Sequence, residues 1–201
     1  MKLVTRCALT LAYAWSAVAL GATSADSLGS ISKVNGSIRI EAGQHAGSVT
    51  TVNGSVTVGA DARTGDIDTV NGSVRIDERA VVEDVETVNG GVTAATGVEV
   101  RGDIETVNGS ITLREGVRVA GGLENVNGAI LIEGAEVRDG IETVNGDIRI
   151  TGGARVLGGI HVEKNRNRSW FGSRKDQVNP RITIEQGAVV GGQEAHHLGH
   201  V

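Results

Sequence analysis

Carboxylate side chains recur at two fixed places before several copies of a Val-Asn-Gly tripeptide, and they are the residues best suited to chemistry. One set lies three residues before the Asn, and the other lies two residues earlier still. Residues two apart in a β-strand share a face, so both sets would gather on one outward face. Such oxygens suit calcium, whose candidate ligands are Asp66, Asp68, Asp84, Glu86, Asp103 and Glu105. The alternative, and the commoner role of charge runs, is a hydrated face that discourages aggregation.

Histidines in the tail, residues 195–201, form a second candidate metal site. They are His196, His197 and His200. Short His-rich tracts can bind metal. However, no Cys or carboxylate is spaced to complete a closed site, although Glu194 could assist. The alternatives are a flexible end or a cap over the last coil.

Catalytic motifs do not recur in the sequence. Serines follow several of the tripeptides, yet no His and Asp are repeated beside them to activate a nucleophile. The Gly-rich dipeptides lack the lysine of a phosphate-binding loop. The chain has 19 Lys+Arg against 24 Asp+Glu, a net charge of −5, which is too acidic for a general nucleic-acid binder. We therefore expect no enzyme activity, no obligatory cofactor and no nucleic-acid partner.

One basic segment stands apart from this acidic chain. It lies within "VEKNRNRSWFGSRKDQVN", as an insertion at about residues 162–177. Aromatic and Arg side chains together supply an apolar anchor and cations. The candidate contact residues for an anionic glycan, lipid or protein are Arg166, Arg168, Trp170, Phe171, Arg174 and Lys175. The alternative is that Trp170 and Phe171 pack back on the body of the protein.

A repeat must position these residues. The Asn of the tripeptide returns every 18 or 19 residues, at Asn35, Asn53, Asn71, Asn89, Asn108, Asn127 and Asn145. A fixed period of this length indicates a repeat architecture. Within each copy, apolar residues alternate with polar ones over short stretches separated by glycines. In one copy the residues expected in the core are Val107, Ile111 and Leu113.

Three short strands per copy would form a roughly triangular coil, and stacked coils would pair each strand with its equivalents. The sequence therefore predicts an all-β, single-stranded parallel β-helix, or β-solenoid, of about eight coils over residues 26–194. The insertion would leave one corner, because Ile160 and Ile182 lie 22 residues apart where their equivalents lie seven apart.

Hairpins are the alternative fold, since Asn-Gly between β segments is typical of a two-residue turn. Hairpins would leave the short segments "AVV", "VRV" and "ARV" without partners. Pro180 also replaces the glycine of the last copy, where a primed turn needs a positive φ that proline cannot adopt. Both observations favour the solenoid.

The phrases "VRGDIETVNGSITL" and "GARVLGGIHV" resemble the repeats of bactofilins, polymer-forming bacterial cytoskeletal proteins. They also resemble an adhesin-type repeat domain of exported bacterial proteins. The resemblance covers about residues 31–190. It implies a right-handed parallel solenoid that stacks end to end and has no enzyme activity. Bactofilins work in the cytoplasm, and the N-terminus of this chain departs from that pattern.

Residues 1–25 have the layout of a secretory signal peptide. Lys2 and Arg6 precede an apolar run that ends in small residues, and the run is shorter than the ~20 residues of a membrane span. Cleavage would remove Cys7, the one cysteine, and would leave a net charge of −7 because two cations go with it. Glycans on sequons of stacked coils would collide, which favours a bacterial source. We expect export to the periplasm, the cell surface or the medium, without a transmembrane segment in the mature chain.

Two functions fit these features. The first is an exported structural, scaffolding or adhesin-like rod that self-associates through its coil ends. The second is an envelope module that uses the basic insertion to bind an anionic partner.

Overall fold

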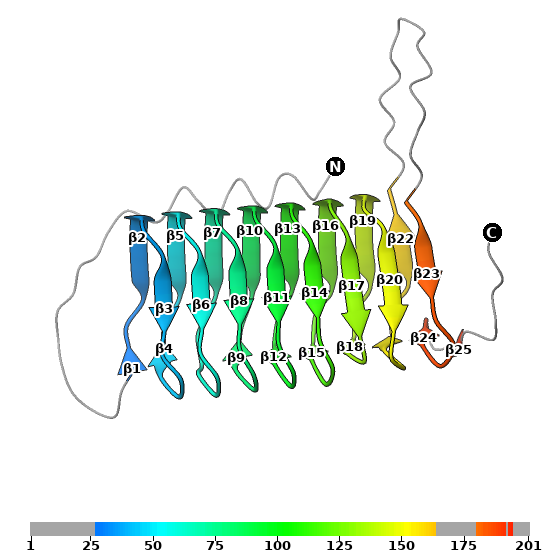
Figure 1. Cartoon of the computed structure of the whole chain (residues 1–201), viewed down its shortest axis with the longest axis horizontal. Coiled ribbons are helices and arrows are strands. Elements are labelled where there is room, and N and C mark those ends of the chain that lie inside the picture. Colours follow the sequence, from blue (N-terminus) through cyan, green and yellow to red (C-terminus); the bar gives the residue numbers. More distant parts are fainter. Residues whose placement is uncertain (1–26, 164–179, 192, 195–201) are drawn as a thin grey trace, which may run out of the picture.

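The chain folds into a parallel β-solenoid, as the repeat predicts. The computed structural model describes residues 27–163, 180–191 and 193–194. Its strands stand side by side along one axis, and successive strands of the chain lie on three different faces of the rod (Figure 1). Each strand pairs in parallel with its equivalents in the neighbouring coils. The hairpin alternative is therefore wrong.

The first sheet contains eight strands, and the first seven of them end at the Asn of the tripeptide. They are β2 (Ile31–Asn35), β5 (Val49–Asn53), β7 (Ile67–Asn71), β10 (Val85–Asn89), β13 (Ile104–Asn108), β16 (Leu123–Asn127), β19 (Ile141–Asn145) and β22 (Ile160–Val162). The number of strands is close to the predicted number of about eight coils.

The second sheet also contains eight strands, which follow the tripeptide. They are β3 (Ile38–Ile40), β6 (Val56–Val58), β8 (Val74–Ile76), β11 (Val92–Ala94), β14 (Ile111–Leu113), β17 (Ile130–Glu133), β20 (Ile148–Thr151) and β23 (Ile182–Ile184).

The third sheet consists of short strands that close each coil. Seven of them form one ladder: β9 (Val81–Val82), β12 (Glu99–Val100), β15 (Arg118–Val119), β18 (Glu136–Val137), β21 (Arg155–Val156), β24 (Val189–Val190) and β25 (Gln193–Glu194). At the other end of the rod, β1 (Ser27–Leu28) pairs with β4 (His45–Ala46). Two isolated parallel bridges, from His45 to Arg63 and from Arg63 to Val81, connect β4 with β9. β25 alone pairs antiparallel, on β24.

The asparagines explain why the tripeptide is repeated. Each amide Nδ2 donates to the Oδ1 of the equivalent Asn in the preceding coil, at 2.9–3.1 Å, from Asn53 to Asn145. The glycine after the Asn packs closely against the backbone of the preceding coil. For example, a Cβ on Gly109 would collide with the carbonyl oxygen of Gly90. Only a residue that is identical in every coil can make such a continuous ladder.

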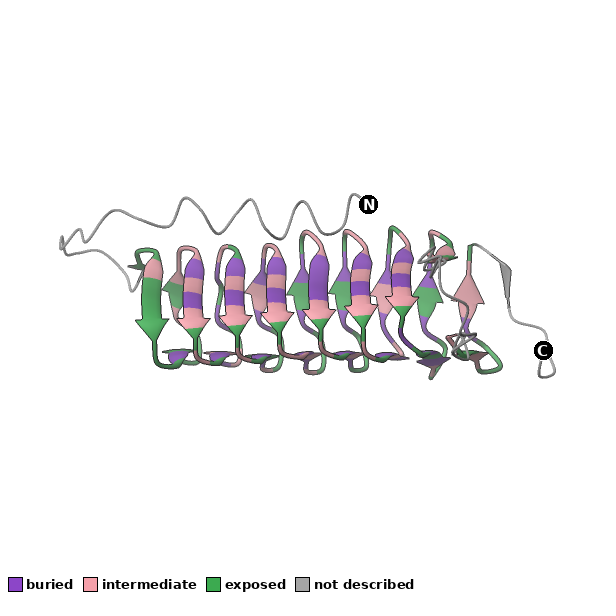
Figure 2. Cartoon of the chain, turned by 90° about the horizontal axis from the view of Figure 1, so that it is seen from above, coloured by how far each residue is buried: buried purple, intermediate pink, exposed green. Residues whose placement is uncertain are grey.

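The core is a narrow column of aliphatic side chains from all three sheets. Ile111 and Leu113 are fully buried, as predicted. Val107 is not in the core, so that prediction is wrong. In β13 the inward positions are Ile104 and Thr106, while Val107 has the outward parity and is half-buried. Figure 2 shows the bands of buried and half-buried residues along the strands of the rod. The hydroxyl of Thr106 satisfies its buried position by donating to Gly90 O at 3.0 Å.

The strands on either side of the predicted insertion are β22 and β23. Ile160 pairs with Ile141 and Ile182 pairs with Ile148, so the two strands occupy consecutive places in one coil. The predicted insertion, at about residues 162–177, begins at the end of β22 and precedes β23 in the chain. Residues 164–179 lie outside the described residues, as do residues 1–26 and 195–201. Across the described ranges, no helix is long and apolar enough to cross a membrane.

Candidate functional site

The carboxylates of the first sheet form a ladder in register. Cα pairing runs from Asp68 through Glu86, Glu105 and Glu124 to Glu142, one residue per coil. We call these five residues the acidic ladder. They lie on the outer face, yet they are half-buried, and Glu105 is only 8% exposed. Like charges therefore stack at about 4.8 Å per coil in a partly desolvated setting.

Asp68 shows what this environment does to a carboxyl group. Burial, followed by the negative charge of Asp66, raises the pKa of Asp68 above its ordinary value of 3.8. Asp84 acts in the same direction. The hydroxyl of Thr50 opposes the rise by donating to Asp68 Oδ2 at 3.4 Å. At Asp68, burial and the neighbouring carboxylates therefore disfavour the charged form of the side chain.

The other predicted calcium ligands have different roles. Asp84 Oδ1 accepts from the backbone N–H of Asp103, and Asp103 Oδ1 accepts from the N–H of Gly122, both at 2.7 Å. A Cβ on Gly102 would collide with the Asp84 carboxylate. These two aspartates stabilise the corner where the connection from the third to the first sheet gains one residue. Asp66 is exposed at the equivalent corner. Of the six predicted ligands, Asp68, Glu86 and Glu105 share the ladder.

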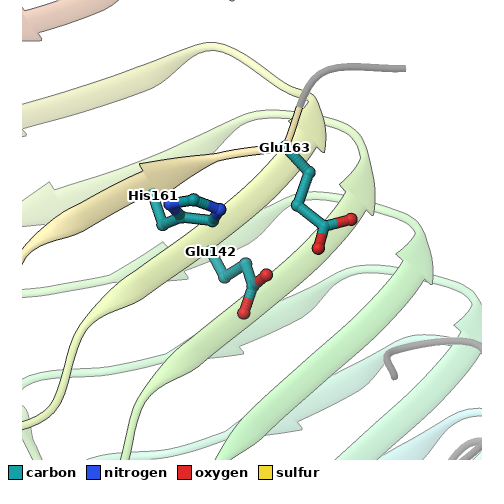
Figure 3. Close-up of side chains that lie close together, drawn as sticks. All are labelled: Glu142, His161 and Glu163. Atoms are coloured by element: carbon teal, nitrogen blue, oxygen red, sulfur yellow. The ribbon is translucent and has the colours of Figure 1, made fainter. Parts of the chain in front are cut away.

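A cluster of mixed ligands lies where the acidic ladder meets the last strand of the first sheet. Register places His161 of β22 beside Glu142 of β19, and Glu163 follows two residues later. The ligand atoms of the three side chains all lie within 4.8 Å of one another. Figure 3 shows the three side chains together over the two neighbouring strands. An imidazole nitrogen and two carboxylates in this arrangement could hold a divalent metal ion.

Backbone hydrogen bonds position all three members of this cluster. The pairing of β19 with β22 fixes Glu142 and His161, and the N–H of Glu163 continues it by donating to Thr143 O at 2.8 Å. Glu142 and Glu163 are half-buried, whereas His161 is exposed. Only side-chain rotation is needed to change the distances between the ligand atoms.

Sequence reasoning did not identify this cluster. It placed Glu142 in the repeated carboxylate set but assigned no ligand role to His161 or Glu163. The signal was present in the register: His161 occupies the ladder position, and Glu163 occupies the place of the outward Val in the tripeptide. The predicted ligands His196, His197 and His200 lie outside the described residues, and so do the predicted contact residues of the insertion.

No protein-family model matches the chain, and no curated protein or solved structure matches it either. The resemblance to bactofilins and to the adhesin-type repeat therefore extends to the solenoid fold alone.

Proposed function

We propose that the protein is a non-enzymatic structural scaffold, a stiff β-solenoid rod that is exported from a bacterial cell and stacks end to end with further copies. The observation that carries this proposal is the continuous register of two eight-stranded sheets. A rod built in this way presents the same side chains at fixed intervals, which suits a protein that spaces or holds other molecules.

The two ends of the rod support stacking. Among the described strands, β2 pairs only with β5, and most of β2 is exposed; it is the green strand at the left in Figure 2. Val34 on this strand is 62% exposed and Leu28 beside it is 40% exposed. An open strand edge of this kind is a template for another chain. A junction of unlike ends does not close on itself and generates a filament.

The opposite end is partly covered. β25 runs antiparallel along β24 and occupies the edge that a further parallel coil would use on the third sheet. We infer that this segment limits growth of the filament. Export rests on the sequence of residues 1–25 and is part of the proposal.

Light scattering over a range of protein concentrations tests the proposal. The average mass of the intact protein should rise with concentration, and a variant that lacks residues 193–201 should associate at lower concentration because the β24 edge is uncovered. Val34→Lys should weaken association by placing a charge at the end of the rod, whereas Thr112→Lys, in the middle, should not. A constant monomer mass for both the intact and the shortened protein would refute stacking.

A further inference from the structure

We propose that Glu142, His161 and Glu163 form a binding site for a divalent transition-metal ion, with zinc as the best fit to the ligand types. The site would link β19 to β22, close to the last described residue before the predicted insertion. It lies on the outer face of the first sheet and includes the last strand of that sheet, β22.

Geometry is the first argument. Zinc binds His nitrogen at about 2.0–2.1 Å and carboxylate oxygen at about 2.0–2.2 Å, so tetrahedral ligand atoms lie about 3.4 Å apart. The ligand atoms of this cluster lie within 4.8 Å of one another. Rotation of side chains on a fixed backbone can close the difference, and because His161 is exposed, its ring is free to turn without displacing a core residue.

Ligand chemistry is the second argument. Calcium takes six to eight oxygen ligands and magnesium keeps most of its waters, whereas imidazole nitrogen favours zinc and its neighbours in the first transition series. Three protein ligands leave a fourth position for water or for a group from another molecule, as in open zinc sites.

The third argument is independent of distances and comes from the repeat. From β7 to β19, the outward pair on each strand of the first sheet is a carboxylate followed two residues later by Val. In β22 and the residue after it, both positions change: His161 replaces the carboxylate and Glu163 replaces Val. The two substitutions fall beside the same residue, Glu142. A general loss of the repeat pattern would not require ligand types at both outward places.

Charge is the fourth argument. Glu124 is the register partner of Glu142 on the side away from His161, so the cluster stands at the end of the acidic ladder. A dication there would reduce repulsion along the outer face, and this gain adds to the ligand bonds themselves. Binding should also stabilise β22, whose residues are less buried than those of the central strands.

Isothermal titration with Zn²⁺ tests the site, in a protein whose tail histidines His196, His197 and His200 are replaced by Gln so that they cannot contribute. One Zn²⁺ should bind per chain. His161→Gln and Glu163→Gln should each weaken binding at least about tenfold, since loss of even an outer partner of a metal ligand costs that much. His45→Gln is the matched control, because His45 is also an exposed strand histidine, and it should bind like its parent.

Two further measurements distinguish loss of binding from loss of folding. Without metal, the melting temperatures of His161→Gln and of its parent should agree, while the rise in melting temperature on adding Zn²⁺ should occur only in the parent. Ca²⁺ should bind at least a hundredfold more weakly than Zn²⁺. Absence of Zn²⁺ binding in the tail-substituted protein, or unchanged affinity after His161→Gln, would overturn the proposal.

Discussion

The outer faces of the first and third sheets use charge in opposite ways on the same rod. In the third sheet the register partners alternate in sign, from Glu99 to Arg118, Glu136 and Arg155. In the first sheet carboxylates stack on carboxylates over five coils. Since alternation is available to this repeat, stacked like charges are not forced by the fold. The difference is one of charge pattern: opposite charges are register partners in the third sheet, whereas like charges are register partners in the first.

Both faces rest on one core, so breaking the core should have the largest effect. Ile111→Asp places an unpaired charge at a fully buried position and should cost more than about 4 kcal/mol of the free energy of unfolding. Thr112→Asp, on the adjacent outward position, should cost far less. Chemical denaturation of both variants checks this prediction, and equal stabilities would contradict the assignment of inward and outward faces.

The Asn-Gly corner, with its ladder of Asn side chains, keeps the first sheet in register. Gly109→Ala should force neighbouring coils apart, because its Cβ would collide with the backbone of Gly90, at a cost of about 1–3 kcal/mol. Gly29→Ala is the control, since a Cβ there meets nothing within 4 Å, and should leave the melting temperature unchanged. Similar melting temperatures for the two variants would mean that the corner tolerates separation.

Reversing one charge on the outer face of the third sheet should create a stack of like charges, as on the first sheet. Arg118→Glu would create a run of three stacked carboxylates, from Glu99 to Glu136, and should destabilise the protein by about 0.5–1 kcal/mol at low salt. High salt should reduce the loss, because screening weakens exposed charges most. Urea denaturation at two salt concentrations measures the effect, and a loss that is independent of salt would point to packing instead.

The smallest predicted effect is a difference in pH dependence between the two kinds of carboxylate. The pKa of Asp68 is raised by burial, so its contribution to stability is full below the unfolded value and is lost as pH rises through the folded pKa. The pKa of Asp61 is lowered by two hydrogen bonds of 2.8 Å from Arg79, so its contribution is lost as pH falls.

Thermal melts from pH 7 to pH 3 of Asp68→Asn and Asp61→Asn, each compared with the parent, separate the two cases. As pH falls, the parent should gain stability relative to Asp68→Asn and lose stability relative to Asp61→Asn. Slopes of the same sign in both comparisons would show that the like-charge ladder does not strain its carboxylates.

The sequence predicted the fold well because, in a solenoid, the repeat length sets both the size of each coil and the pairing of equivalent strands. Eighteen or nineteen residues per copy, three alternating segments and a repeated Asn were sufficient to predict parallel stacking. The inward and outward positions near the corner were harder. Val107 is apolar and lies outside, while Thr106 is polar and lies inside, because a hydroxyl beside the corner can bond the carbonyl of the preceding coil.

The functional residues were less predictable for a related reason. Spacing alone grouped Asp84 and Asp103 with the outward carboxylates, although their side chains accept backbone N–H groups at a lengthened corner. The cluster of Glu142, His161 and Glu163 joins residues of two coils. It becomes visible only when the register is known, since nothing local distinguishes a lone His in "GGIHVE".

Electron microscopy of the purified protein, intact and without residues 193–201, tests most directly whether the rod is a unit of a larger structure. If copies stack through their ends, straight filaments one rod wide should form, with a reflection near 4.8 Å along the filament axis because strands continue across each junction. Single short particles at every concentration, in both forms of the protein, would contradict the proposal of an end-to-end scaffold.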